Sequence, residues 1–502
     1  MNRTKKFALN SVTAMSVQLV TLLFGLITPR LLIQTYGSEV NGLVSSLNQF
    51  ISYITLVEAG IGGAAIFALY KPLHDKNEGK ISSIVVAAKK SYRQAGYLFS
   101  AGILAIALIY GLLKSTEELN FWVIAPLTLL LAANSFSDFF FVSGRRVLLT
   151  ADQRNYFISI ASIVNIVTRN VFICVLAFYR MDVLVVYSVS VLTALIKIAI
   201  IYIYTKKKYP YIENKALPDN ASMNMRWDVI YQQILGMIQS GAPVVLATIL
   251  LDLTTVSIYS VYNMVVAGIN GVLGIFVSGL PAGFGDLIAS GEEKKLQKTV
   301  VEFEVAYYFI LSITYGLTLA LIMPFIDIYT SGLTDANYYN VALGIIIVLN
   351  GLWHNIKTPQ SMLIQSAGLY KETRWRSTVQ AAIIVVAGLF FGHYFGMIGI
   401  LLGSIISHVF RTIDLMIFIP RKVTKNSIFH TAKRLFSVFL NMSMIALPML
   451  LIKYQPQSYF AWLLMALIYG VYAVIVTTCT TMLIEKEAFF AVCKRLLHII
   501  SR

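Results

Sequence analysis

The chain has 502 residues, of which 57% are hydrophobic and 13% are charged, and its mean hydropathy is +0.73. So few charged residues cannot cover the surface of a soluble protein of this size, so the composition excludes that class and predicts a polytopic membrane protein. The formal net charge of +16 indicates membrane topology and contact with anionic lipid head groups, and no nucleic-acid partner is expected.

Apolar segments of spanning length follow one another along almost the whole chain, and each must form a helix in hydrocarbon. The first has the basic flank of a signal peptide but continues to about residue 34 without a small-residue cleavage site, so it is interpreted as a membrane span. The predicted spans are 8–34, 40–69, 94–113, 121–143, 156–178, 183–205, 229–251, 256–289, 303–325, 338–368, 377–395, 397–419, 436–453 and 459–484. The sequence therefore predicts an all-α polytopic membrane protein with about 14 transmembrane helices.

Two halves of the chain repeat one another. The same number of residues separates the members of three pairs: Asn134 and Asn350, Asp138 and His354, and Ala151 and Ala367. A similar number separates the segment VEAGIGGA from the similar segment VSGLPAGF. We therefore expect two six-helix lobes related by a repeat, with a substrate cavity at their interface. The predicted domains are an N-terminal lobe (1–206), a cytoplasmic linker (207–227), a C-terminal lobe (228–420), two additional helices (436–484) and a cytoplasmic basic tail (485–502).

The distribution of basic residues predicts the orientation in the membrane. Of the 40 Lys and Arg residues, 32 fall in the N-terminus, the C-terminus and the even-numbered connections. Three fall on the opposite side: Lys114, Arg180 and Lys453. By the positive-inside rule, both termini and the loop at residues 206–208 face the cytoplasm.

Ionisable side chains within the spans are the candidate functional residues. A charge at that depth costs at least ~2.5 to 3.5 kcal/mol on insertion scales, so it normally faces water or a partner. In the segment 340–368, His354, Lys357, Ser361 and Gln365 follow helical spacing and predict one polar helix face. The candidate substrate-binding residues are Arg30, Arg169, Lys197, His354, Lys357 and Arg411.

Two carboxylates, Glu58 and Asp138, are the candidates for ion coupling. Protonation or cation loading would change their attraction for Arg169 and Lys197, so a gradient of H+ or Na+ could bias the transport cycle. A static network of ion pairs is the alternative. Structural roles also remain open for Arg411, which lies one turn from Asp414, and for Arg30, which could reach the membrane interface.

Motifs for catalysis are not found. The sequence has no Walker phosphate loop, HExxH or GxSxG motif, and its three cysteines have no paired spacing. No catalytic residue, metal site, disulfide or cofactor is therefore expected, which favours transport over an enzymatic function.

Two segments resemble a known family. The opening NSVTAMSVQLVTLLFGLITPRLLIQTYGSEVNGLVSSLNQFISYITLVEAGIGGA and the later GRRVLLTADQRNYFISIASIVNIVTRNV are similar to the polysaccharide (Wzx-type) flippases of the multidrug/oligosaccharidyl-lipid/polysaccharide (MOP) exporter superfamily. The resemblance implies two six-helix lobes plus a helix pair, alternating access, and a cationic cavity. It also implies a location in the bacterial cytoplasmic (inner) membrane.

The implied substrate is an undecaprenyl-pyrophosphate-linked oligosaccharide repeat unit, moved to the outer leaflet for capsule or exopolysaccharide synthesis. Its implied partners are membrane lipid, a polysaccharide polymerase and glycosyltransferases. On this interpretation, we expect Lys357, at the middle of its helix, and Arg169 to hold the pyrophosphate.

Two other functions remain open. A cation-coupled drug antiporter of the same superfamily would have a cavity dominated by carboxylates and aromatic residues. A membrane enzyme of glycan assembly would carry a large external loop, whereas the external connections predicted here are short.

Overall fold

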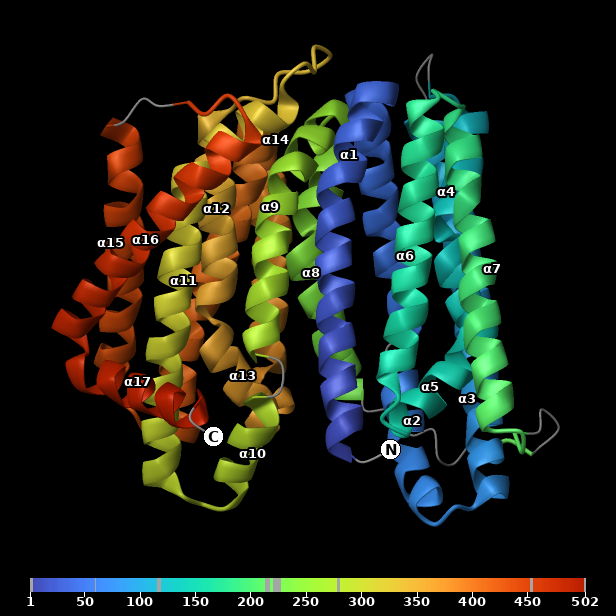
Figure 1. Ribbon diagram of the computed structural model, residues 1–502, viewed down its shortest axis with the longest axis horizontal. Helices are drawn as coiled ribbons and strands as arrows, with labels where there is room; N and C mark the ends of the chain where they lie inside the picture. The colour runs from blue at the N-terminus through green and yellow to red at the C-terminus, as the bar shows by residue number, and fades with distance from the viewer. Residues whose placement is uncertain are drawn as a thin grey trace. The chain divides into compact units, whose positions relative to one another are not determined.

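The structure is a computed structural model that describes residues 3–58, 60–114, 119–212, 217–219, 227–277, 280–451 and 455–500. The regular elements in these ranges are helices (Figure 1). Within the described ranges, eleven helical stretches are long and apolar enough to cross a membrane, and two of them, Ala8–Glu58 and Tyr370–Thr424, each correspond to two predicted spans. With α15 (Ile428–Leu451) these make fourteen segments, so the predicted fold class is confirmed.

The described residues form two compact units, Met1–Met237 and Ile238–Arg502. The helices of the first unit are α1 (Arg3–Thr55), α2 (Ile61–His74), α3 (Glu78–Leu113), α4 (Phe121–Ser137), α5 (Ser143–Ala151), α6 (Asn155–Phe178), α7 (Val183–Lys208) and the first part of α8 (Trp227–Leu250). A π-helical turn, Asp138–Val142, joins α4 to α5. α1 bends at Gly37, whose φ of 84° and ψ of 169° suit only glycine, so two predicted spans form one bent helix.

The second unit continues with a matching series of helices. They are α9 (Leu253–Val277), α10 (Leu280–Ala289), α11 (Glu293–Thr330), α12 (Val341–Ile356), α13 (Thr358–Ala367) and α14 (Tyr370–Ile419), followed by α15, α16 (Tyr459–Ile484) and α17 (Lys486–Ile500). α14 is broken at Gly396, with φ 58° and ψ −137°, between the predicted spans 377–395 and 397–419.

The helix boundaries confirm the repeat. α3 begins at Glu78 and α11 begins at Glu293, while α5 ends at Ala151 and α13 ends at Ala367. The offset between the two starts is nearly the same as the offset between the two ends. Both offsets agree with the one that separates Asn134, Asp138 and Ala151 from Asn350, His354 and Ala367 in the sequence. The lobe limits 1–206 and 228–420 stay predictions.

Several basic segments interpreted as loops are helical. α3 begins at Glu78 and covers most of the predicted connection 71–93, and the predicted basic tail forms α17. Hydropathy detects only the part of a helix that lies in hydrocarbon, whereas Lys, Arg and Glu are good helix formers beyond it. The N-cap of α3 supports this start, because the Asn77 side chain accepts a hydrogen bond from the Lys80 amide at 3.0 Å. Within the predicted linker, residues 213–216 and 220–226 lie outside the described ranges.

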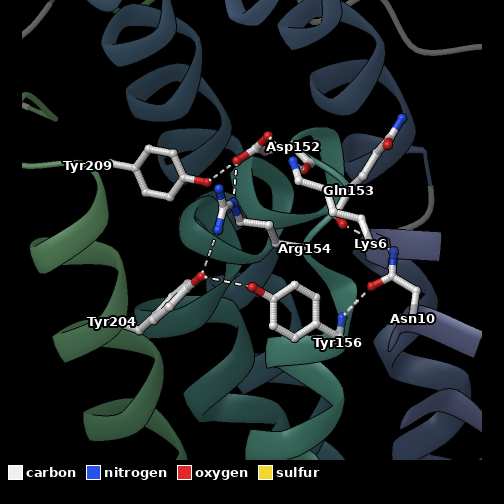
Figure 2. A network of polar contacts seen from close by, with 8 residues as sticks. All are labelled: Lys6, Asn10, Asp152, Gln153, Arg154, Tyr156, Tyr204 and Tyr209. Atoms are coloured by element: carbon white, nitrogen blue, oxygen red, sulfur yellow. Dashed lines mark hydrogen bonds and ion pairs between the residues drawn. The ribbon is translucent and has the colours of Figure 1, made fainter. Parts of the chain in front are cut away.

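A polar network fastens the start of α1 to the turn between α5 and α6 (Figure 2). The Lys6 ammonium lies 2.8 Å from the Asp152 carboxylate, and Asn10 accepts a hydrogen bond from the Tyr156 amide at 2.6 Å. The Tyr209 hydroxyl, beyond the end of α7, donates to Asp152 at 2.6 Å. The network therefore fixes one end of α1, on the N-terminal side of its bend.

Candidate functional site

A cavity of about 350 Å³ lies among α1, α4, α6 and α7 of the first unit. Arg169 of α6 contributes a cationic group to its wall, and Pro29 lies in the part of α1 that lines it. The polar residues that line it with Arg169 are Thr21, Thr28, Asn41, Ser45, Asn48, Asn170, Tyr187 and Ser190. None of the lining residues is an aspartate or a glutamate, so the cavity is cationic.

Arg169 has no carboxylate partner among the described residues, and its Nε is buried without a hydrogen bond there. The neighbouring amide of Asn170 is already engaged, since its Oδ1 accepts from the Thr28 hydroxyl at 3.0 Å and its Nδ2 donates to the Ile166 carbonyl at 2.8 Å. A guanidinium inside a membrane span is costly unless water or an anion compensates its charge. This cavity can therefore receive an anionic group.

Of the two carboxylates expected to attract Arg169 and Lys197, Asp138 pairs with one of these cations and Glu58 pairs with neither. Asp138 binds Lys197, with oxygen–nitrogen distances of 2.7 and 3.0 Å. Glu58 binds Arg146 at 2.9 Å, so the predicted attraction of Glu58 for Arg169 and Lys197 is wrong. The physical reason is position: Glu58 lies in the short turn that follows α1, within reach of α5.

Arg146 is a residue that the sequence reasoning missed, because the pair at 145–146 was assigned to a basic connection. It lies on α5, and its guanidinium also contacts the Tyr92 hydroxyl at 3.4 Å. Glu58, Arg146 and Tyr92 line a second cavity of about 460 Å³ in the first unit. In this cavity the charges of Glu58 and Arg146 balance one another, unlike the charge of Arg169.

The prediction that Lys357 lies in the middle of a continuous helix is wrong. α12 ends at Ile356 and α13 begins at Thr358, with Pro359 in its first turn, because proline cannot donate a hydrogen bond to the preceding turn and its ring clashes there. The buried Lys357 ammonium donates to the His354 carbonyl at 3.1 Å and lies 3.0 Å from Nδ1 of His408. The predicted polar face from His354 to Gln365 is therefore divided between two helices.

The remaining predicted basic residues have other surroundings. Arg411 binds Asp414 at 2.7 Å, and Arg376 also contacts Asp414, which favours the structural role for Arg411. The His354 ring packs edge-on against the ring of His408 at 5.2 Å. Arg30 is half-buried on α1 and does not line the cavity around Arg169.

Glu304 and Arg434 form an ion pair that the sequence reasoning also missed. Both side chains are 6% exposed and their charged atoms lie 2.6 Å apart, which joins α11 to α15. Gln360 donates to the same glutamate at 2.9 Å. The sequence does contain a signal for this ion pair, because Glu304 is a glutamate within the predicted span 303–325. In the part of the chain that the structure describes, no group of three His, Cys, Asp or Glu residues could hold a metal ion.

No protein-family model and no curated protein matches the chain. Solved structures match its fold over most of its length. The lipid II flippase MurJ, in an inward closed conformation, has a TM-score of 0.60 and 13% identity, with 95% of this chain and 99% of that chain covered. An inward-facing multidrug resistance MATE family transporter has a TM-score of 0.58 and 15% identity, with 81% and 99% covered.

A third match is a MOP superfamily transporter from Pyrococcus furiosus with a reverse-polarity binding pocket. Its TM-score is 0.52 at 13% identity, with 85% of this chain and 98% of that chain covered. At such identities the likeness concerns the fold. This chain is a polytopic membrane protein with the fold of the MOP superfamily transporters.

Proposed function

We propose that the protein is a Wzx-type flippase, which moves undecaprenyl-pyrophosphate-linked oligosaccharide from the cytoplasmic to the outer leaflet by alternating access. The observation that carries this proposal is Arg169, an uncompensated guanidinium in a polar cavity without a lining carboxylate. The pyrophosphate is the part of such a substrate that is hardest to move, because its charge must cross a region of low dielectric constant. A guanidinium binds phosphate oxygens through two parallel hydrogen bonds, which suits Arg169 to this role.

Lys357 is the second residue that we propose for binding the pyrophosphate. Its ammonium is held by the His354 carbonyl and His408, so it acts as a positioned point charge. Arg30, Lys197, His354 and Arg411 remain proposed contributors, although the ion pairs of Lys197 and Arg411 weaken their case. Glu58 and Asp138 remain proposed sites for coupling to H+ or Na+.

One of the solved structures supports a lipid-linked substrate. One protein of this fold is a lipid II flippase, and the alignment covers nearly all of both chains. Another is described as having a pocket of reverse polarity that suggests a different function. In this chain, the cationic wall of the cavity at Arg169 supports an anionic substrate in place of an organic cation.

A drug antiporter is the second candidate, because MATE transporters share the fold. An organic cation would need a carboxylate or an aromatic cage to offset its charge. The cavity at Arg169 offers no lining carboxylate, and in the first unit Glu58 and Asp138 already pair with basic residues. The polarity of the described cavity therefore favours the flippase.

The test is complementation of a flippase-null strain, with surface glycan and membrane protein level measured together. Arg169→Gln should lower export by about tenfold or more, because a hydrogen bond to a charged group contributes ~1.5–3 kcal/mol. Arg169→Lys should retain part of the activity, since it keeps the charge but loses the planar fork. Arg180→Gln, in the exposed turn after α6, is the matched control and should export normally. Normal export by Arg169→Gln at normal protein level would refute the proposal.

A further inference from the structure

A third cavity of the first unit, of about 200 Å³, lies among α3, α5 and α7 and carries a different cluster of cations. Each helix supplies one basic residue to its wall: Lys89 from α3, Arg145 from α5 and Lys206 from α7. No aspartate or glutamate is among its lining residues. We propose that this basic pocket binds the phosphate of an anionic membrane lipid, a site that is separate from the proposed transport function.

The helix packing holds these cations close together. Gly144 allows α5 to approach α3, since a Cβ atom at this position would lie 3.3 Å from the Val85 carbonyl oxygen. The Arg145 guanidinium lies over the ring of Tyr202, 4.4 Å from its centroid, and donates to the Phe141 carbonyl at 3.1 Å. The Lys206 ammonium lies 6.0 Å from the centroid of the same ring. The aromatic ring therefore preorganises two of the three positive charges.

An acidic residue close to the basic pocket is already neutralised. Tyr209 lines the pocket and donates to Asp152. The same carboxylate binds Lys6 at 2.8 Å and Arg154 at 2.5 Å (Figure 2). Because like charges that converge in a partly buried site repel one another, a bound anion would stabilise the basic pocket.

The size and surroundings of the basic pocket point to a lipid head group. Its volume is below the ~300–1,000 Å³ typical of sites for larger ligands, so it suits a phosphate group. It lies at the end of α7 where the Lys and Arg distribution predicts the cytoplasmic leaflet. Beside it, Phe141, Tyr202 and Ile203 are 58%, 42% and 65% exposed, and apolar groups exposed on a spanning helix can contact acyl chains. Basic pockets between helices on this side of a membrane bind anionic head groups.

The experiment measures lipid retention by the full-length protein with native mass spectrometry, after reconstitution in phosphatidylcholine with or without phosphatidylglycerol. The wild type should retain phosphatidylglycerol in preference to phosphatidylcholine. Arg145→Gln/Lys206→Gln should lower this retention by roughly tenfold or more, since each basic group near an anionic surface strengthens binding by about fivefold. Lys207→Gln/Lys208→Gln removes the same charge from exposed residues that do not line the pocket and should retain the lipid as the wild type does.

Three results would overturn the proposal: equal losses in the two double variants, unchanged retention in Arg145→Gln/Lys206→Gln, or full competition by inorganic phosphate alone. The last result would assign the basic pocket to a soluble anion, because a lipid site also requires the apolar contacts. If the double variant does not fold, Lys206→Gln alone decides the question. Lys206 is exposed, so its loss should leave folding intact and lower retention by about fivefold; unchanged retention would reject the site.

Discussion

At the scale of the residue, the charges buried in the spans differ in whether a partner is present. Lys197 and Asp138 are paired, with side-chain exposures of 13% and 24%, whereas Arg169 has no such partner among the described residues. Asp138→Asn should lower the free energy of unfolding by about 2–4 kcal/mol, because it leaves the ammonium of Lys197 without its counter-charge. Asp138→Asn/Lys197→Met should restore most of this loss, measured by thermal unfolding in detergent.

The same variants separate a static ion pair from ion coupling. If Asp138 couples transport to an ion gradient, Asp138→Asn/Lys197→Met will be stable but will transport independently of that gradient. A static pair instead predicts a double variant with the wild-type gradient dependence. Transport by Asp138→Asn at the wild-type rate, with unchanged gradient dependence, would also remove Asp138 from the coupling mechanism.

The sequence was sufficient to place Arg169 and Lys197 within apolar helices, but it missed Arg146, which lies in the candidate span Phe121–Ala151, and it did not predict all of the ion-pair partners. Hydropathy located Arg169 and Lys197 correctly, because the cost of burying a charge depends mainly on depth. The pairing of Glu58 with Arg146 depends on how the turn after α1 approaches α5, which hydropathy does not encode. The break at Lys357 had a local signal in Pro359, since proline lacks the N–H group that would bond to the Asn355 carbonyl of the preceding turn.

At the scale of the element, the break in α14 depends on one glycine. Gly396 has φ 58° and ψ −137°, and a Cβ atom there would meet nothing within 4 Å. Gly396→Ala should therefore destabilise the protein by about 1–3 kcal/mol through backbone strain alone. Gly470→Ala is the matched control, since that glycine lies inside α16 with equally open space, and it should stabilise the protein by about 0.5–1 kcal/mol. Equal melting temperatures for the two variants would contradict this account.

The attachment of α1 gives a second prediction at this scale, and it concerns pH. Burial raises the pKa of the Asp152 carboxyl, but hydrogen bonds from Lys6, Tyr209 and Arg154 outweigh burial and hold the pKa below its usual range. A lowered carboxyl pKa contributes stability above the unfolded-state value, near pH ~4, and this contribution is lost as the pH falls through the folded-state pKa.

Asp152→Asn should accordingly destabilise the protein by about 1–3 kcal/mol at neutral pH and flatten the fall in stability below pH ~4. Thermal unfolding across a pH series measures both effects. The exposed Asp75, after the end of α2, provides the control Asp75→Asn, which should leave the neutral-pH stability unchanged. An unchanged pH profile in Asp152→Asn would contradict the role assigned to the network in Figure 2.

At the scale of the whole molecule, the repeat was visible in the sequence only as a few matched residues. The match between Ala151 and Ala367 coincides with the ends of α5 and α13. The starts of α6 and α14, at Asn155 and Tyr370, follow these two ends at nearly the same distance. Side chains are less constrained, so the two breaks fall at different residue types: the π-helical turn at Asp138 and the proline-marked junction at Lys357.

The last prediction concerns orientation, which the distribution of basic residues predicts. Because Lys and Arg are retained on the cytoplasmic side during insertion, the loop at residues 206–208 should face the cytoplasm and the loop at 331–340 should face outward. After replacement of Cys174, Cys479 and Cys493, an impermeant maleimide on intact cells should label Thr334→Cys but not Lys207→Cys. Both positions are exposed, so burial cannot account for a difference between them. Permeabilised cells provide the control, in which both should react. Labelling of Lys207→Cys in intact cells would invert the topology and place the basic pocket in the outer leaflet.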